Sequence, residues 1–189
     1  MSQVIVIEFV SLDGVIQDPD GNEGFRHGGW AFRYGPEPVT GDPFALSEVL
    51  GTGALLLGRR TWEMFAKIWP GRDDPFSAKM NAMPKLVASR SLVQAAGWQN
   101  STVLPGDLAA AVRERRRAQD IIVMGSASVV RTLLASYLVD EYRLMVFPLI
   151  LGEGMRLFPD GTAPVNLALA SAQTTGPAVK LIYTRPEHQ

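Results

Sequence analysis

The sequence contains no cysteine, and this absence excludes several kinds of chemistry at once. Without thiols, the chain forms neither a disulfide framework nor a thiolate metal site, and it offers no cysteine nucleophile. Histidine is also scarce, since only His27 and His188 occur. Because imidazole metal centres draw on several histidines, we expect no bound metal.

Neither sign of charge is in excess, since 18 basic and 19 acidic residues leave a formal net charge of -1. Nucleic acids are bound chiefly through clustered Lys and Arg, so we expect no nucleic-acid partner. Glu8 interrupts the first apolar run before that run could serve as a signal or a membrane span. These features predict a cytoplasmic protein that has no membrane partner and binds a small molecule.

Hydrophobic residues make up 47% of the 189 positions, enough apolar material for one continuous core with room for a ligand cleft. The sequence shows no internal repeat, low-complexity tract or linker-like change in composition. We therefore predict a single domain over residues 1–189.

Short apolar runs alternate along the chain with stretches of helical spacing. Strands are predicted at 4–7, 54–57, 85–88, 102–104, 121–124 and 142–147, with two more between 167 and 183. Helices are predicted over 43–50 and 107–119 and from about residues 61 and 129. This order is typical of an α/β fold with a mostly parallel central sheet, helices on both faces and an antiparallel edge.

The segment from Ser11 to about Pro43 is rich in glycine and proline and carries several aromatic residues. Long connections of this composition are more often lids or binding loops than linkers. Within it, Trp30 could form an apolar wall for a flat substrate ring, and so could Trp69 further along the chain. Each indole could equally do no more than pack its own loop.

The strongest local motif is Gly58-Arg59-Arg60-Thr61, which follows one predicted strand and opens a helix. Backbone N–H groups and the helix dipole at such a start attract a phosphate, and glycine allows it to approach closely. Arg59 and Arg60 add permanent charge suited to forked contacts with a phosphate monoester. Turns of this kind also occur for packing alone.

A second turn of small residues, 125–128, again lies between a strand and a helix and could hold a pyrophosphate. Ser89 and Arg90 follow a third strand. Ligands of open α/β sheets bind beyond the carboxyl ends of the strands, so these turns would converge on a dinucleotide if the three strands were neighbours.

Several motifs follow one another along nearly the whole chain. They are Ser11-Leu12-Asp13-Gly14-Val15-Ile16, Gly58 to Glu63, Ser89-Arg90-Ser91, Gly125-Ser126-Ala127, Leu138 to Glu141 and Pro148 to Gly154. In this order the chain resembles the dihydrofolate reductase superfamily, especially the branch similar to the C-terminal reductase domain of bifunctional riboflavin-biosynthesis deaminase-reductases. The resemblance implies a dihydrofolate-reductase-like fold and an NADPH-dependent reduction of a small planar substrate such as a pteridine or pyrimidinone.

The resemblance also implies the cofactor site. Arg59 and Arg60 would bind the 2′-phosphate side of NADPH, Thr61 would meet the pyrophosphate, and Ser89 with Arg90 would flank the adenosine. The turn Asp13-Gly14 would border the nicotinamide, although an Asp-Gly pair is also an ordinary turn. The remaining predicted cofactor residues are Gly58, Gly125, Ser126, Ala127, Ser128, Val129 and Val130.

Two departures from the family pattern concern the turn after residue 124. The family usually has two consecutive glycines joined by a cis peptide where this chain has Gly125-Ser126, and a non-proline cis bond is costly. Riboflavin-pathway reductases commonly carry Glu immediately before that pair, where this chain has Met124. We therefore rank 5-amino-6-(5-phosphoribosylamino)uracil reduction below a reductase of unassigned substrate.

The remaining expectations are a catalytic acid, an assembly and two competing functions. Dihydrofolate reductases place an acid ahead of the second strand, and Asp42 is the candidate here, although an Asp before Pro43 is also an ordinary helix cap. The apolar segment 144–151 and the family likeness predict a homodimer that buries the late strands. A protein that binds NADPH without turnover, or an interaction module that binds no nucleotide, remains an alternative to the reductase.

Overall fold

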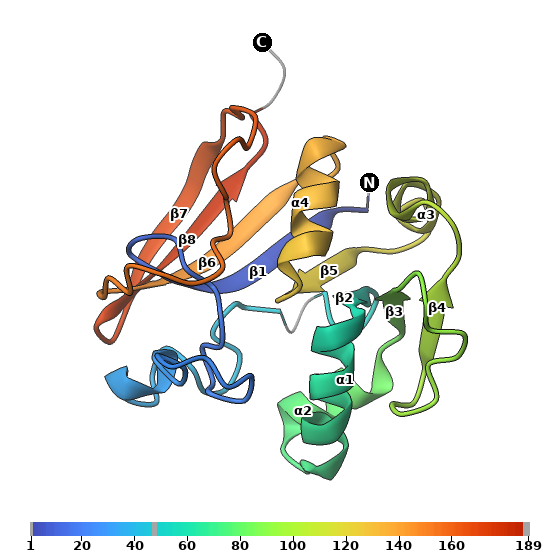
Figure 1. Cartoon of the computed structure of the whole chain (residues 1–189), viewed down its shortest axis with the longest axis horizontal. Coiled ribbons are helices and arrows are strands. Elements are labelled where there is room, and N and C mark those ends of the chain that lie inside the picture. The colour runs from blue at the N-terminus through green and yellow to red at the C-terminus, as the bar shows by residue number, and fades with distance from the viewer. Residues whose placement is uncertain (1, 47–48, 187–189) are drawn as a thin grey trace.

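The computed structural model of the protein describes residues 2–46 and 49–186. Ser47 and Glu48, which fall within the predicted helix over 43–50, and His188 lie outside the described residues. The described chain contains an eight-stranded sheet with the strand order β4-β3-β2-β5-β1-β6-β8-β7. Figure 1 shows this sheet crossing the molecule, with helices above and below it in that view.

The strands are β1 (Val4–Ser11), β2 (Ala54–Gly58), β3 (Lys85–Ala88), β4 (Ser101–Leu104), β5 (Ile121–Met124), β6 (Glu141–Phe147), β7 (Ala168–Thr175) and β8 (Ala178–Thr184). The helices are α1 (Arg59–Ile68), α2 (Pro75–Ala82), α3 (Leu108–Arg115) and α4 (Ala127–Ala135), with short 3-10 helices η1 (Ala31–Tyr34) and η2 (Trp69–Gly71). Pairing is parallel from β4 to β6 and antiparallel where β8 joins β6 and β7. The predicted α/β fold with an antiparallel edge is therefore confirmed.

The central strand β1 is buried on both faces, as expected for a parallel strand covered by helices on both sides. Successive side chains of a strand point to opposite faces. Val4 and Val6 belong to a core cluster with residues of α3 and α4, whereas Ile5 and Ile7 belong to a second cluster with residues of α1 and α2. The sheet thus separates two hydrophobic cores.

The predicted helix over 43–50 is wrong in its described part. Residues 43–46 and 49–50 form turns and irregular backbone. Ala45 has a φ of 53°, in the left-handed region, and a residue in this conformation cannot continue a right-handed helix. The apolar spacing of the segment reflects burial instead, since Phe44, Leu46 and Leu50 all pack into the α1 and α2 side of the core.

Helix α2 was not predicted, although its start carries a recognisable signal. The Asp74 carboxylate accepts hydrogen bonds from the amides of Phe76 and Ser77, and Pro75 takes the first helical position. Helix α3 begins after the cap Asp107 as predicted, but it ends at Arg115.

The hairpin of β7 and β8 forms the antiparallel edge of the sheet and lies away from the helices (Figure 1). All residues of β7 except the last are exposed, and most residues of β8 are only partly buried. Leu169 on β7 is 57% exposed. An exposed edge strand of this length carries unpaired backbone groups that another chain can pair with.

Candidate functional site

The three turns that the sequence singles out lie at one edge of the sheet, on adjacent strands. Gly58 ends β2, Ser89 follows β3, and Gly125 follows β5, while the strand order places β3, β2 and β5 side by side. All three strands are parallel, so their carboxyl ends meet at the same edge. This is the location where open α/β sheets bind ligands.

The turns after β2 and β5 touch each other directly. The amide of Gly58 donates a hydrogen bond to the Ser126 hydroxyl at 2.9 Å, and that hydroxyl lies 3.3 Å from the carbonyl of Met124. A Cβ atom on Gly125 would lie only 3.0 Å from Cγ2 of Thr61. Glycine at this position therefore allows the two turns to approach closely.

The backbone of the β5 turn is unusual because two successive residues are left-handed. Gly125 has a φ of 61° and Ser126 a φ of 60°. Every peptide bond among the described residues is trans, including the bond that joins this pair. A non-glycine residue in the left-handed region is strained, and such residues cluster at binding sites.

Helices α1 and α4 both begin at this edge, and within the described chain neither N-terminus has a side-chain cap hydrogen bond. The first amides of a helix have no intrahelical acceptor. In α4 the amides of Val129 and Val130 already donate to the Ser126 carbonyl, at 2.8 and 3.1 Å. A bound anion could accept hydrogen bonds from the amides of Ala127 and Ser128 in α4 and from the amide of Arg59 in α1.

Arg59 links the turn after β2 to the turn after β3. Its Nε donates to Glu63 Oε1 at 2.7 Å, and its Nη1 donates to the Ser91 hydroxyl at 3.0 Å. The Ser89 hydroxyl closes its own turn by accepting from the Leu92 amide at 3.0 Å. Arg60 and Arg90 are exposed at the same edge. The predicted basic residues are thus brought together.

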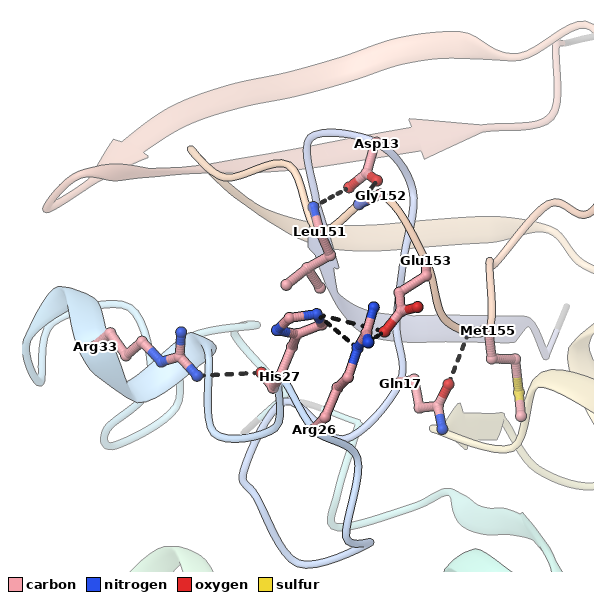
Figure 2. Close-up of polar contacts among 9 residues, drawn as sticks. All are labelled: Asp13, Gln17, Arg26, His27, Arg33, Leu151, Gly152, Glu153 and Met155. Carbon is pink, nitrogen blue, oxygen red and sulfur yellow. Dashed lines mark hydrogen bonds and ion pairs between the residues drawn. The ribbon is translucent and has the colours of Figure 1, made fainter.

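The Asp13 carboxylate holds two loops together. Its carboxylate oxygens accept a hydrogen bond from the Ser11 hydroxyl at 2.6 Å. They also accept from the Leu151 amide at 3.2 Å and the Gly152 amide at 2.8 Å (Figure 2). Desolvation alone would raise the pKa of Asp13, but these hydrogen bonds outweigh it and lower the pKa to about 2. Asp13 therefore joins the turn after β1 to the loop after β6; a nicotinamide contact stays a prediction.

Further polar contacts fasten the 11–43 segment to the loop after β6. Figure 2 shows Gln17 Oε1 accepting from the Met155 amide, at 2.9 Å, and the side chains of Arg26 and His27 converging on Glu153. Arg26 forms an ion pair with Glu153, and His27 Nε2 lies 3.4 Å from the same carboxylate oxygen. His27, taken from the sequence as a lone loop histidine, thus has an acidic partner.

The predicted substrate wall is not supported at Trp30. Its indole is fully buried, packs edge-on against Phe147 and donates to the Gln17 carbonyl at 2.8 Å. Trp30 is a core residue that holds the 11–43 segment on the sheet. Trp69 is only partly buried, beside Phe65 and Phe76, so its substrate role stays a prediction.

The candidate catalytic acid Asp42 lies in a turn. Its Oδ1 accepts a hydrogen bond from the Leu46 amide at 2.6 Å, and its carbonyl accepts from Ala45 at 3.1 Å. Arg143 of β6 donates to the Phe44 and Ala45 carbonyls, which fixes this turn to the sheet. The carboxylate therefore caps the turn, and a catalytic role for it stays a prediction.

Sequence reasoning missed Glu8, which the structure makes the most unusual acid of the site. It follows Ile7, the last residue of β1 that pairs with β5, and is only 6% exposed. Its Oε1 has no hydrogen-bond partner among the described residues. The available signal was an acid inside an otherwise apolar strand, but the sequence pattern does not show that this acid lies beside Gly125.

Burial raises the pKa of Glu8 well above its usual range, and a backbone hydrogen bond from Gly125 offsets only part of this effect. The nearby negative charge of Glu23 raises it further. Glu23 itself has a raised pKa, caused by burial and by Asp18 and Asp20, whereas Arg60 acts in the opposite direction. The 11–43 segment is therefore coupled electrostatically both to Glu8 and to the turn after β2.

The described residues contain no group of three or more His, Asp or Glu side chains placed to hold a metal ion. Their helices are also too short or too polar for any to cross a membrane.

Comparison with known proteins identifies the family. The family model of the RibD C-terminal domain matches residues 2–181, and the chain therefore belongs to that family. It is 26% identical over 189 residues to the uncharacterized protein YyaP of Bacillus subtilis (strain 168), covering 96% of this chain and 94% of that protein. A shorter match, 31% identical over 72 residues, links it to the uncharacterized protein YwjB of the same organism, over 38% of this chain and 41% of that protein.

Solved structures confirm the fold. A protein from Shewanella sp. PV-4 that is named for riboflavin biosynthesis superposes with a TM-score of 0.77 at 21% identity, over 99% of this chain and 100% of that one. A pyrimidine reductase-like protein from Corynebacterium diphtheriae NCTC superposes with a TM-score of 0.67 at 15% identity, over 99% and 93% of the two chains. The predicted dihydrofolate-reductase-like fold is thus confirmed.

Proposed function

We propose that this protein is an NADPH-dependent reductase that transfers hydride to a small planar, heterocyclic substrate. The observation that carries the proposal is the contact between two uncapped helix starts at one sheet edge, with Arg59 reaching from one of them to the turn after β3. Membership of the RibD C-terminal family and the name of one structural neighbour, a pyrimidine reductase-like protein, support the reductase class.

The residues present fit a phosphorylated dinucleotide. Backbone amides at the starts of α1 and α4 suit the pyrophosphate, and Gly125 lets the two turns that carry these amides approach each other closely. Arg59, Arg60 and Arg90 suit the additional 2′-phosphate that distinguishes NADPH from NADH. Glu63 pairs with Arg59 at 2.7 Å, so its charge is compensated within this group. When bound, NADPH supplies the hydride; the chain orients it and excludes water.

The position before the glycine turn favours an unassigned substrate over the riboflavin precursor. Met124 stands where riboflavin-pathway reductases commonly carry Glu, and it packs against the apolar cluster on the α1 and α2 side of the sheet. This environment gives a pyrimidinone no acidic partner at residue 124. A planar ring with a larger apolar portion suits the position better.

Two measurements test the function. NADPH should quench tryptophan fluorescence saturably and bind more tightly than NADH, and its oxidation should be followed by absorbance with a panel of pterins, pyrimidinones and quinones. Turnover with one class supports the proposal and names the substrate class. Tight NADPH binding without turnover in any class would favour the non-catalytic alternative, and absence of binding would favour an interaction module.

We also propose a homodimer built on the β7–β8 hairpin. The support is a group of large exposed apolar side chains on and beside it, including Ile150, Val165, Leu167 and Leu169. Exposed apolar groups beside an open strand edge favour pairing with a second copy. Light scattering should give a dimer mass that Leu169→Lys lowers to the monomer mass, and a monomer at all concentrations would contradict the proposal.

A further inference from the structure

The charge of Glu8 is stabilised less than that of other buried or half-buried acids in the described chain, because it has no cationic partner there and a backbone hydrogen bond from Gly125 is its one stabilising contact. Asp140 pairs with Arg116 at 2.8 Å and Arg185 at 3.3 Å, and the Asp18 carboxylate accepts from two backbone amides. Glu8 forms no ion pair among the described residues, and its Oε1 accepts no hydrogen bond there. Burial without such partners favours the protonated form of a carboxyl, because the neutral form costs less to desolvate.

The position of Glu8 relates this neutral acid to the dinucleotide site. Ile7 pairs with Met124, so Glu8 lies at the level where β5 ends and the turn 125–126 begins. On its other side Glu8 pairs with Leu144 of β6. Residues alternate along β1, so the Glu8 side chain shares the face of Val6, which α4 covers. The carboxyl thus lies beside the start of α4.

The charges around Glu8 come from few elements. The turn after β5 places Gly125 beside Glu8, and β6 places Leu144 beside it. The first residues of α4 have small or apolar side chains. The 11–43 segment contributes Glu23, with Asp18 and Asp20 acting on Glu23. Arg60, from the turn after β2, acts on Glu23 as well. These surroundings give Glu8 negative neighbours and no cation in contact, which favours its neutral form.

Resting on the proposed function, we infer that Glu8 is a binding residue of this site and presents the O–H of a neutral carboxylic acid to an acceptor oxygen of the dinucleotide held at the 125–126 turn. A neutral acid is the form of this side chain that avoids repelling the phosphates. It also supplies a carboxyl donor beside the backbone N–H groups and the Ser126 hydroxyl of the turn. The carboxyl is covered in this structure, with Glu8 only 6% exposed, so the inference requires that it becomes accessible when the dinucleotide binds.

Calorimetric titration of NADPH at several pH values, with wild type, Glu8→Leu and Glu8→Gln, tests the inference. Leu removes the donor and should weaken binding about tenfold at neutral pH, since a hydrogen bond of this kind contributes roughly 1–1.5 kcal/mol. Gln is neutral and keeps a donor, so its affinity should stay within about threefold of wild type. Wild-type affinity should fall as pH rises through the pKa of Glu8, whereas the affinity of Glu8→Gln should not.

A matched control is Glu141→Gln, which alters a half-buried acid that pairs with Arg143 near the opposite end of the sheet. It should lower the melting temperature without changing NADPH affinity or its pH dependence. If wild type binds NADPH but Glu8→Leu binds it equally well at every pH, Glu8 is only a structural acid and the inference is overturned. If wild type binds no NADPH, the proposed function fails and this inference fails with it.

Discussion

Two parts of the same sheet edge satisfy their backbone polar groups in opposite ways. The turn after β1 and the loop after β6 close on each other through side chains, since Asp13 and Gln17 accept hydrogen bonds from the Leu151, Gly152 and Met155 amides. The turns after β2 and β5 open helices that lack side-chain caps, and the second turn contains two left-handed residues.

This difference in hydrogen bonding suggests that one part of the edge stabilises the fold and that the other part binds a ligand. A carboxylate that accepts several hydrogen bonds fixes a loop but has little capacity left for a ligand, whereas uncapped helix starts leave donors for an anion. Asp13 and Glu8 show the same contrast in their protonation. The hydrogen bonds to Asp13 lower its pKa to about 2, whereas burial raises the pKa of Glu8. We expect the first part to determine stability and the second part to determine affinity.

Asp13→Ala should have the largest effect on stability. It removes the acceptor of two backbone amides and the Ser11 hydroxyl, so we expect the free energy of unfolding to fall by about 3 kcal/mol. Urea denaturation measures this change. Asp20→Asn, at a loop acid of the same segment, is the control and should change stability by less than about 0.5 kcal/mol. Comparable losses in the two variants would contradict a specific role for Asp13.

Arg59→Ala should affect binding and leave stability nearly unchanged. A charge-assisted contact with phosphate contributes about 1.5–3 kcal/mol, so NADPH affinity should fall by roughly one to two orders of magnitude while NADH affinity barely changes. Glu63→Gln is the matched control, because it frees the Arg59 guanidinium and should preserve or increase NADPH affinity. An equal loss for both cofactors in Arg59→Ala would show that Arg59 supports the fold and does not recognise the 2′-phosphate.

Glu8 and Asp13 should change the free energy of unfolding with pH in opposite directions. Burial raises the pKa of Glu8 in the folded protein above its ordinary value of 4.5, so the contribution of Glu8 to stability is present below that pH and is lost as pH rises through the folded pKa. Across this window Glu8→Gln should remove a slope of about 1.4 kcal/mol per pH unit. Asp13 has a lowered pKa, so its contribution is lost as pH falls from about 3.8 to about 2. Unfolding free energies measured across pH test both signs.

Glu153→Gln should have the smallest effect. The Arg26 and Glu153 side chains are 70% and 42% exposed, and exposed ion pairs contribute about 0.2–1 kcal/mol. We expect a loss of about 0.5 kcal/mol or less, together with faster amide hydrogen exchange over residues 17–29. A loss as large as that of Asp13→Ala would mean that the ion pair fastens the 11–43 segment more strongly than the Asp13 and Gln17 contacts do.

The sequence alone determined the strands, the glycine turns and the α/β order, because these depend on local apolar runs and on residues adjacent along the chain. The run Ile121 to Met124 and the cap Asp107 are two cases in which a local signal predicted the observed element. The helix over 43–50 failed for the opposite reason. Its apolar spacing records burial against the sheet, while Ala45 takes a left-handed conformation that no local pattern revealed.

Only the tertiary structure decided which turns meet and what each acid does. Strands β3, β2 and β5 become neighbours through long crossovers, so the contact between Gly58 and Ser126 spans 68 positions of the chain. The partners of Asp13 lie 138 and 139 residues away, and the Asp-Gly pair itself indicates only a turn. In the sequence, Glu8 only interrupts an apolar run. Its burial beside Gly125 results from folding. Local propensity is encoded by neighbouring residues, whereas burial, pKa and the convergence of a site depend on residues that only folding brings together.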